Sequence, residues 1–224
     1  MKLGEISVSY LEIIAKTMTQ LNCDVLGIFE QYSISPLVFT SPDARISIPK
    51  LLHIVHACIE ITETPWLGLE MGRMTAPTNL GVPGLIAMTA ADLRQACQAI
   101  AHYELLNSFN VRGQSKFYIS QGSGIKDGIL EFYSLSPYND YNYFVVDSVL
   151  SGWMNVITAL IGTVGAVKQV CFEFPAPSYY DKYDDFFTCE VLFNQPANKL
   201  IINADSLNES CINSCETIYH LLKH

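Results

Sequence analysis

The sequence predicts an α+β fold in which a helical N-terminal half precedes a mixed sheet of about five strands, covered by one long helix. Three observations predict this fold. As far as Tyr103, apolar residues recur three and four positions apart, as they do on helices that pack on a core. After Asn107 they form short runs of aromatic and branched residues, which are typical of strands. Residues 143–161 then form a long apolar helix candidate, which can cover one face of the sheet.

Four helices are expected before residue 75. Residues 8–21 place Leu11, Ile14 and Met18 on one face, and residues 25–32 form a short second helix. Pro49 suits the first turn of a helix over 49–61. A fourth helix is expected to start at 64–65 and to end at Gly72.

A segment rich in glycine and proline, 81–84, precedes the clearest helical pattern. Thr89 is the expected N-cap of that helix, with Asp92 three residues on as the acid of a capping box. Leu93, Ala96, Cys97 and Ile100 form its apolar stripe. We therefore expect a helix that begins after Thr89.

The second half of the sequence predicts strands and helices in the order β-β-α-β-α-β-β. Residues 116–121 and 129–135 form a hairpin, followed by the helix 143–161, a strand over 168–174 and a short helix over 179–187. Residues 190–193 and 199–202 are expected to pair around Gln195-Pro196. Ser206 is expected to cap a final helix that runs to His224. These elements predict one domain over 1–205 and a linker helix over 206–224.

The charge balance argues against DNA binding by these residues. The 224 residues carry 13 Lys and Arg against 22 Asp and Glu, a net charge of −9, and the basic residues are scattered. Nucleic acids are bound by clustered cationic side chains that replace phosphate counterions. The seven cysteines are odd in number and several lie in apolar runs, and no signal peptide opens the chain. The helix 143–161 carries too many polar residues for a membrane span. We therefore expect a cytoplasmic protein without disulfides.

Several motifs, in order, are similar to one branch of AraC-type transcription regulators. The branch is the arabinose-binding-like N-terminal domain of ornithine- and arginine-responsive members. The resemblance covers roughly residues 8–208, and it departs at Glu190, where that family usually has proline. The matching motifs are 41–49 (SPDARISIP), 66–72 (WLGLEMG), 80–84 (LGVPG), 92–96 (DLRQA), 172–177 (FEFPAP), 187–193 (FTCEVLF) and 198–200 (NKL).

This resemblance implies a regulator that binds a small effector, such as an amino acid or related metabolite, and pairs with itself. It also implies a C-terminal domain with two helix-turn-helix units, which is absent from residues 1–224. DNA would then be contacted only through that absent domain.

The sequence offers no pattern for catalysis or for a resident metal or cofactor. Cys211, Cys215, His220 and His224 are zinc-type residues, but on one helix the cysteines and the histidines would point to opposite faces. No nucleophile elbow or phosphate-binding loop is present. We therefore expect no enzyme, no metal site and no cofactor.

A polar stripe on the helix 143–161 gives the candidate effector site. Asp147, Ser151, Asn155 and Thr158 recur four, four and three apart, which favours a solvent-facing stripe. Alternatively, the stripe faces a cavity, where Asp147 would meet a cationic effector and Asn155 would bond to it. Arg45, Arg73 and Arg112 are each either surface ion-pair partners or carboxylate ligands. The candidate effector-binding residues are Asp147, Asn155, Trp153, Tyr118, Glu131, Tyr133 and Arg73.

Two functions therefore remain open. The first is a sensor in which effector binding between helix 143–161 and the sheet shifts a dimer or interdomain equilibrium. The second is a structural dimerisation module that binds no small molecule.

Overall fold

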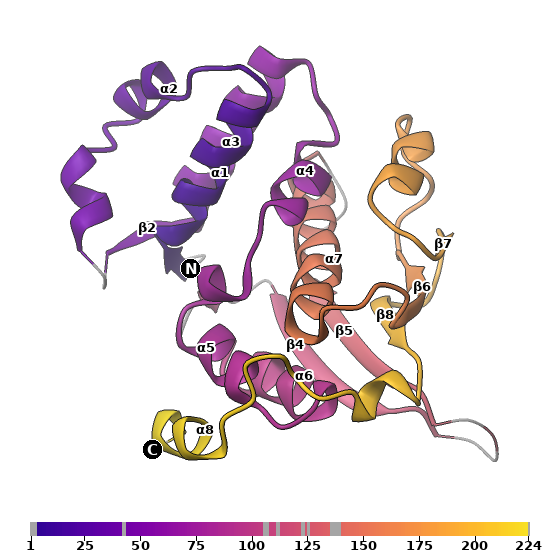
Figure 1. Ribbon diagram of the computed structural model, residues 1–224. Coiled ribbons are helices and arrows are strands. Elements are labelled where there is room, and N and C mark those ends of the chain that lie inside the picture. The colour runs from indigo at the N-terminus through magenta and orange to yellow at the C-terminus, as the bar shows by residue number, and fades with distance from the viewer. Residues whose placement is uncertain are drawn as a thin grey trace.

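In the computed structural model the N-terminal helices lie to one side of the sheet and its long helix (Figure 1), and two hydrophobic cores meet where a short helix packs on that long helix. One core belongs to the N-terminal helices and the other to the sheet and its covering helix. The α+β prediction is confirmed, as are the five-stranded mixed sheet and the long helix. The structure describes residues 4–41, 44–104, 108–110, 113–121, 124, 126–134 and 140–223.

The N-terminal core is formed by α1 (Ser9–Gln20), α2 (Leu26–Gln31) and α3 (Ile48–Thr62), as the apolar periods predict. Leu11, Ile14 and Met18 are buried along α1. A 3₁₀ helix, η1 (Pro36–Thr40), follows α2, and the hydroxyl of Ser35 accepts a bond from the Leu37 amide at its start. Periodicity is therefore a sufficient guide to this lobe's helices.

A small antiparallel sheet in the N-terminal half was not predicted. Its strands are β1 (Gly4–Ser7), β2 (Arg45–Ser47) and β3 (Ser108–Asn110), in the order β2-β1-β3. These strands have three or four residues each and pair across long stretches of chain. Strands this short show no period of two, so a purely helical N-terminal half was the wrong prediction.

The helix α4 (Leu67–Arg73) packs closely on the long helix α7 (Asp140–Ile161). A Cβ atom on Gly72 would lie 2.5 Å from Cβ of Ser151, and one on Gly68 would lie 2.6 Å from the Phe144 carbonyl oxygen. Close approach of the two backbones thus requires glycine at both positions. Leu67 and Met71 contribute to the N-terminal core and Leu69 to the sheet core, so α4 joins the two.

The polar stripe of α7 faces α4, and the solvent-facing interpretation is wrong. Asp147 and Ser151 are almost fully buried. The Ser151 hydroxyl donates to the Leu69 carbonyl at 2.9 Å, and the Asn155 amide donates to the Thr75 carbonyl at 2.8 Å. The Leu69 carbonyl lies within α4, and the Thr75 carbonyl follows the end of that helix, so these polar side chains are buried with hydrogen-bond partners on the α4 segment.

The glycine- and proline-rich segment is itself helical. The 3₁₀ helix η2 (Pro77–Leu80) leads into α5 (Val82–Thr89), and α6 (Leu93–His102) follows. Thr89 is the last residue of α5, so its prediction as an N-cap is wrong. Asp92 is the N-cap of α6, and its carboxylate accepts the Gln95 amide at 2.8 Å.

The main sheet has the strand order β4-β5-β8-β6-β7. Only β6 and β7 are parallel among its pairs. The predicted pairing of the last two strands is wrong, because β6 lies between them. The strands are β4 (Gly113–Ile119), β5 (Gly128–Ser134), β6 (Val167–Cys171), β7 (Glu190–Leu192) and β8 (Asn198–Ile202).

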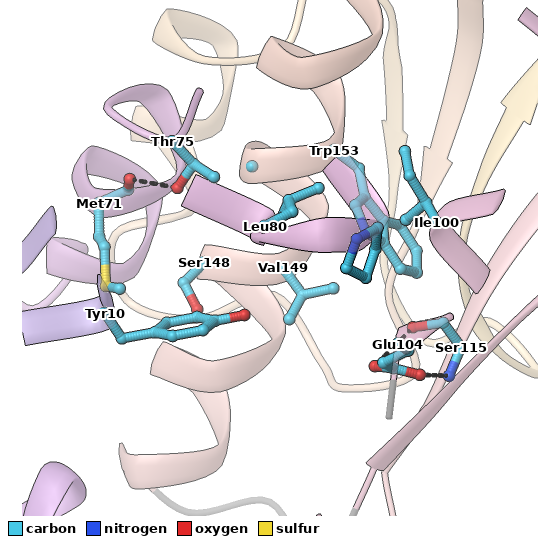
Figure 2. A pocket seen from close by; sticks show the side chains of 12 residues that line it. Tyr10, Met71, Thr75, Leu80, Ile100, Glu104, Ser115, Ser148, Val149 and Trp153 are labelled. Carbon is cyan, nitrogen blue, oxygen red and sulfur yellow. Dashed lines mark hydrogen bonds between the residues drawn. The ribbon is translucent and has the colours of Figure 1, made fainter. Parts of the chain in front are cut away.

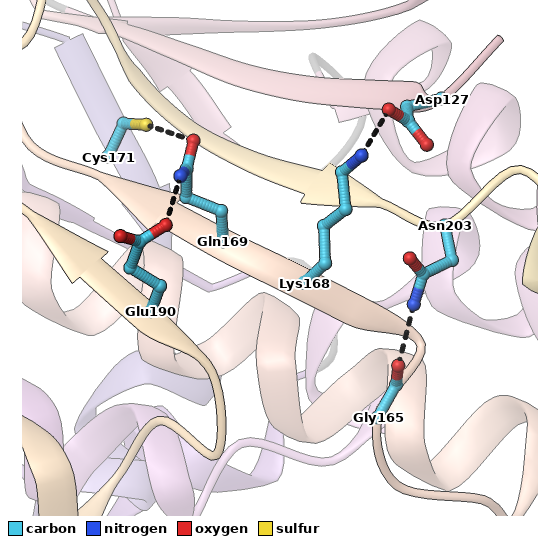
Figure 3. A network of polar contacts seen from close by, with 7 residues as sticks. All are labelled: Asp127, Gly165, Lys168, Gln169, Cys171, Glu190 and Asn203. Atoms are coloured by element: carbon cyan, nitrogen blue, oxygen red, sulfur yellow. Dashed lines mark hydrogen bonds and ion pairs between the residues drawn. The ribbon is translucent and has the colours of Figure 1, made fainter. Parts of the chain in front are cut away.

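Polar contacts fix β6 in its place in the sheet (Figure 3). The register of β6 against β8 shifts between Val167 and Gln169, and at this bulge Lys168 reaches Asp127 in an ion pair. Gln169 bonds to Glu190 on the neighbouring β7. A bulge redirects the side chain of its extra residue, which allows this contact.

The prediction of one continuous helix after Ser206 is wrong. After β6, η4 (Tyr180–Asp185) takes the place of the expected short helix. After β8 the chain forms a 3₁₀ turn, η5 (Ser206–Asn208), and α8 begins only at Glu216 and ends at Leu222. Leu207 and Cys211 are buried in the sheet core, and the Cys215 amide donates to the Thr89 carbonyl of α5 at 3.0 Å. The domain boundary at residue 205 stays a prediction.

One helix segment among the described residues, Tyr143–Ile161, is long and apolar enough to cross a membrane, with a mean hydropathy of 1.6. In the fold this segment is the greater part of α7. Its Leu150, Val156 and Ile157 are fully or almost fully buried in the sheet core. Burial between protein elements explains its apolar composition.

Candidate functional site

A cavity of about 70 Å³ lies where the N-terminal core meets the sheet core; we call it the junction cavity. It has room for several water molecules or a small organic group. Seven different elements, together with the segments that follow two of them, contribute to it. The lining residues are Tyr10 of α1, Met71 of α4, Thr75, Leu80 of η2, Pro83 of α5, Ile100 of α6, Glu104, Ser115 of β4, and Ser148, Val149, Gly152 and Trp153 of α7.

Close approach of η2 and α5 forms one end of the cavity. A Cβ atom on Gly84 would lie 1.7 Å from the carbonyl oxygen of Pro77, so only glycine allows this contact. The Asn79 side chain accepts the Ala76 amide at 2.8 Å and holds the turn. The 80–84 motif thereby brings Leu80 and Pro83 to the cavity.

Trp153 is the largest side chain that lines the cavity. Its ring meets Phe132 edge to face, with centroids 6.3 Å apart, and it is 5% exposed. The indole N–H has no hydrogen-bond partner among the described residues. The indole N–H can therefore donate to a ligand acceptor.

Glu104, just after α6, supplies the carboxylate of the cavity. Its Oε2 accepts the Ser115 backbone amide at 2.7 Å, and its Oε1 accepts the Ser115 hydroxyl at 2.9 Å. Burial raises the pKa of this carboxyl, and the two bonds from Ser115 act in the opposite direction. Among the described residues no ion pair includes Glu104. The carboxylate thus retains acceptor capacity for a ligand donor.

Hydroxyl groups lie on the other side of the cavity. Figure 2 shows Tyr10 beside Ser148, away from Trp153, Ile100 and Glu104. The Ser148 hydroxyl donates to the Val145 carbonyl at 2.9 Å, and the Thr75 hydroxyl donates to the Met71 carbonyl at 3.0 Å. Both oxygens keep lone pairs for a donor. An apolar cavity with a few convergent polar groups is typical of small-molecule sites.

The structure divides the predicted site residues among several locations. Trp153 lines the junction cavity, and Asn155 lies beside it through its bond to Thr75. Asp147 does not line the cavity. Its two oxygens accept the hydroxyls of Tyr183 at 2.6 Å and Tyr179 at 2.9 Å. A direct contact between Asp147 and an effector stays a prediction.

Asp147 is a fully buried carboxyl without a cation beside it among the described residues. Burial raises the pKa of Asp147 to about 7, although both tyrosine bonds lower it. Burial and the nearby carboxylate raise the pKa of Tyr179 and of Tyr183. This group connects α7 to η4 and contributes to the pH dependence of folding.

Tyr118, Glu131 and Tyr133 lie on the sheet face that points away from the cavity. Strand pairing places Lys116 opposite Glu131, and Ser115 opposite Phe132 on the inner face. The Tyr118 hydroxyl donates to Glu131 at 2.7 Å, and Lys116 forms an ion pair with Glu131 at 2.7 Å. Burial alone would raise the pKa of Glu131, but bonds from Lys116 and Tyr118 lower it. These residues form a surface cluster of their own.

Arg73 and Arg45 do not line the cavity. Arg73 forms an ion pair with Glu70 and lies over the ring of Phe186, with 4.7 Å from its Cζ to the centroid. Arg45 is exposed on β2, and Arg112 lies outside the described residues. In the described part of the chain no three His, Cys, Asp or Glu side chains gather as a metal site. His224 also lies outside the described residues.

Tyr10, Glu104 and Ser115 were missed by sequence reasoning. Tyr10 lies on α1, Glu104 just after α6 and Ser115 on β4, and no spacing rule joins them. Glu104 follows the stripe of α6 at the point where the helical period ends, which is the one local signal it offers. The 80–84 motif was noticed, but its close backbone contact is a tertiary feature.

Another apolar groove, of about 620 Å³, lies among α1, α2 and η1. Phe29 and Phe39 line it with ring centroids 5.9 Å apart, and Glu12, Lys16 and Glu30 also line it. All of its lining residues belong to the N-terminal half. Of these two cavities, only the junction cavity is lined by residues of both cores. A ligand bound there could therefore shift the position of one core relative to the other.

Comparisons with known proteins agree on one class. The family model described as the arabinose-binding domain of AraC transcription regulator, N-term, matches residues 23–210. The Ornithine utilization regulator of Pseudomonas aeruginosa is 20% identical over 219 residues, which cover 94% of this chain and 62% of that protein. The crystal structure of transcriptional regulator CdpR from Pseudomonas aeruginosa is similar in fold. It has a TM-score of 0.62 and 12% identity, with 88% of this chain and 59% of that chain covered. The chain thus spans less than two thirds of the length of either relative.

Proposed function

Because this chain belongs to the family of N-terminal arabinose-binding domains of AraC transcription regulators, we propose that it senses a small effector for such a regulator. The observation that carries the proposal is the junction cavity, which is lined by α1 and α4 on one side and by α6, α7 and β4 on the other. An occupant would contact elements of both cores at once. The relatives are transcription regulators, and we propose no catalytic activity for this chain.

Sensing would follow from a difference in affinity between two states. A ligand shifts an equilibrium only by as much as it binds one state better than the other. Most small-molecule pockets have roughly 300–1,000 Å³, so a full-sized effector would have to widen the cavity of about 70 Å³. Widening would move α4, η2 or α6 relative to α7. A coupling free energy of about 1–3 kcal/mol between effector binding and the state of the regulator is enough for regulation.

The proposed partners follow from charge. With a net charge of −9, this domain is unsuited to hold DNA, so we propose that another part of the regulator does so. The seven cysteines are free thiols. Together with the burial of α7, they favour a cytoplasmic location.

Filling the cavity tests effector sensing. We expect Val149→Phe to place its ring in the cavity and to abolish effector-induced thermal shifts, while the fold is kept. The measurement is a thermal-shift screen of amino acids, amines, sugars and aromatic acids, followed by calorimetry. Val164→Phe is the matched control, because Val164 is exposed outside the cavity.

Effector binding that survives Val149→Phe would contradict the proposed site. If no compound class binds the wild-type domain, the second function, a structural dimerisation module without a ligand, would be favoured.

We also propose that the domain pairs with a second copy through α5 and α8. These helices contact each other and expose Val82 and Leu85 on α5 and Ile218 and Leu221 on α8. Exposed apolar side chains that gather on adjacent elements are typical of interaction surfaces.

A charge on this surface tests the pairing. Leu221→Asp is expected to convert the dimer to monomer and to weaken association at least about tenfold, since a buried unpaired charge costs several kcal/mol. Sedimentation velocity measures the change. Leu37→Asp is the control, because Leu37 is 75% exposed on η1 and Leu221 is 73% exposed on α8. A Leu221→Asp protein that remains dimeric would exclude this surface.

A further inference from the structure

We propose that the effector is a small amine, whose ammonium group binds the Glu104 carboxylate while its apolar part lies against Trp153. This inference deepens the proposed function and rests on it. It assigns the chemical class of the ligand from the groups that line the junction cavity.

The carboxylate is held in place before a ligand arrives. Two bonds from Ser115, of 2.7 and 2.9 Å, fix both oxygens of Glu104 against β4. Such fixed orientation lowers the entropic cost of binding. Each oxygen can accept at least one further donor. An ammonium group offers three donors and the compensating charge, whereas a carboxylate ligand would be repelled.

The groups around Glu104 suit a cation on a short aliphatic chain. Ile100, Val149 and Leu80 line the cavity and can contact methylene groups (Figure 2). Trp153 has the most electron-rich ring for a cation–π contact. Its N–H has no partner among the described residues, so it can also donate to a hydroxyl or carbonyl of the ligand.

The opposite side of the cavity favours a second polar group. The Ser148 oxygen there can accept a further bond, and Tyr10 lies next to it. A ligand with a polar group at each end would present one end to Glu104 and the other to Ser148, and 1,4-diaminobutane is the probe for this arrangement. We therefore expect 1,4-diaminobutane to bind better than n-butylamine.

Four probes of similar size separate charge from shape. Calorimetry of the wild-type domain is carried out with 1,4-diaminobutane, n-butylamine, n-butanol and butyrate at constant ionic strength. The expected order of affinity is diamine, amine, alcohol, with butyrate weakest. Glu104→Gln is expected to weaken both amines at least about tenfold and n-butanol by less than about threefold, since only the charge-assisted bond is lost.

Glu60→Gln is the matched control, because Glu60 is exposed on α3 and pairs with His56. It removes the same charge far from the cavity. Amine binding that falls equally in Glu60→Gln and Glu104→Gln would show a net-charge effect and would overturn the assignment.

The outcomes separate this inference from the proposed function. If butyrate or n-butanol binds best and Val149→Phe abolishes that binding, the cavity senses an effector but the amine class is wrong. If the amines bind and Val149→Phe leaves them unaffected, both the class at this site and the site itself are wrong. If no amine binds the wild-type domain at millimolar concentration, the amine assignment is overturned, and the wider screen decides whether sensing remains.

Discussion

Replacing Gly84 by alanine is expected to lower the midpoint of thermal unfolding by roughly 4–8 °C. The new Cβ atom would lie 1.7 Å from the Pro77 carbonyl oxygen and 3.0 Å from the Cβ of Leu80. The first of these neighbours is backbone, so α5 or η2 must shift as a whole. Overpacking of this kind costs about 1–3 kcal/mol and occasionally more. The better helix propensity of alanine, about 1 kcal/mol, offsets only part of the cost.

A matched glycine in another helix serves as the control. Gly27 lies in α2, and a Cβ atom there would have no neighbour within 4 Å. Gly27→Ala should therefore be neutral or slightly stabilising. Chemical denaturation of both variants measures the difference. Equal stability of the two variants would contradict the close contact of η2 with α5. Loss of effector response by Gly84→Ala in its folded state would further link this contact to the cavity.

The second large effect is a loss of stability as pH rises, caused by Asp147. Burial raises its pKa to about 7, from an ordinary value of 3.8. Between these two values the folded protein keeps a proton that the unfolded chain releases. The contribution of Asp147 to stability is therefore greatest below about pH 4 and is lost between about pH 4 and pH 7, and it amounts to up to about 4 kcal/mol.

Asp147→Asn is expected to remove most of this dependence. The asparagine carbonyl can accept from one tyrosine, and its amide can donate to the other, so the bonds to Tyr179 and Tyr183 are largely kept. At pH 8 the variant should be at least as stable as the wild type, and its unfolding free energy should change less between pH 5 and 8. Urea unfolding at several pH values measures this difference.

Asp184→Asn removes one carboxylate from an exposed position of η4 and controls for the change in net charge. Glu104, whose pKa is also raised, leaves some pH dependence of the same sign in every variant. The comparison between Asp147→Asn and Asp184→Asn isolates the buried group. Parallel pH profiles for wild type and Asp147→Asn would show that Asp147 is ionised in the fold throughout this range.

The sequence was sufficient for the elements that are built from local patterns. Apolar residues three and four apart determined α1, α2, α3, α6 and α7, because burying such a stripe stabilises a helix wherever it packs. Branched and aromatic runs determined the strands of the main sheet. The ordered motifs also identified the family, since they record positions such as Gly72 and Gly84 where a side chain does not fit.

Only the tertiary structure decided the strand order, the small sheet and the candidate site. Strand β6 separates β7 from β8 because pairing depends on the whole sheet and not on the turn between neighbours. The solvent-facing interpretation of the α7 stripe was wrong because polar side chains can be buried when backbone carbonyls of a packed neighbour accept their hydrogen bonds. Tyr10, Glu104 and Ser115 meet at one cavity although up to 105 positions separate them along the chain. Local periodicity in the sequence shows which face of a helix or strand is buried. A cavity, in contrast, forms where several packed elements leave a gap between them, so it depends on the tertiary structure.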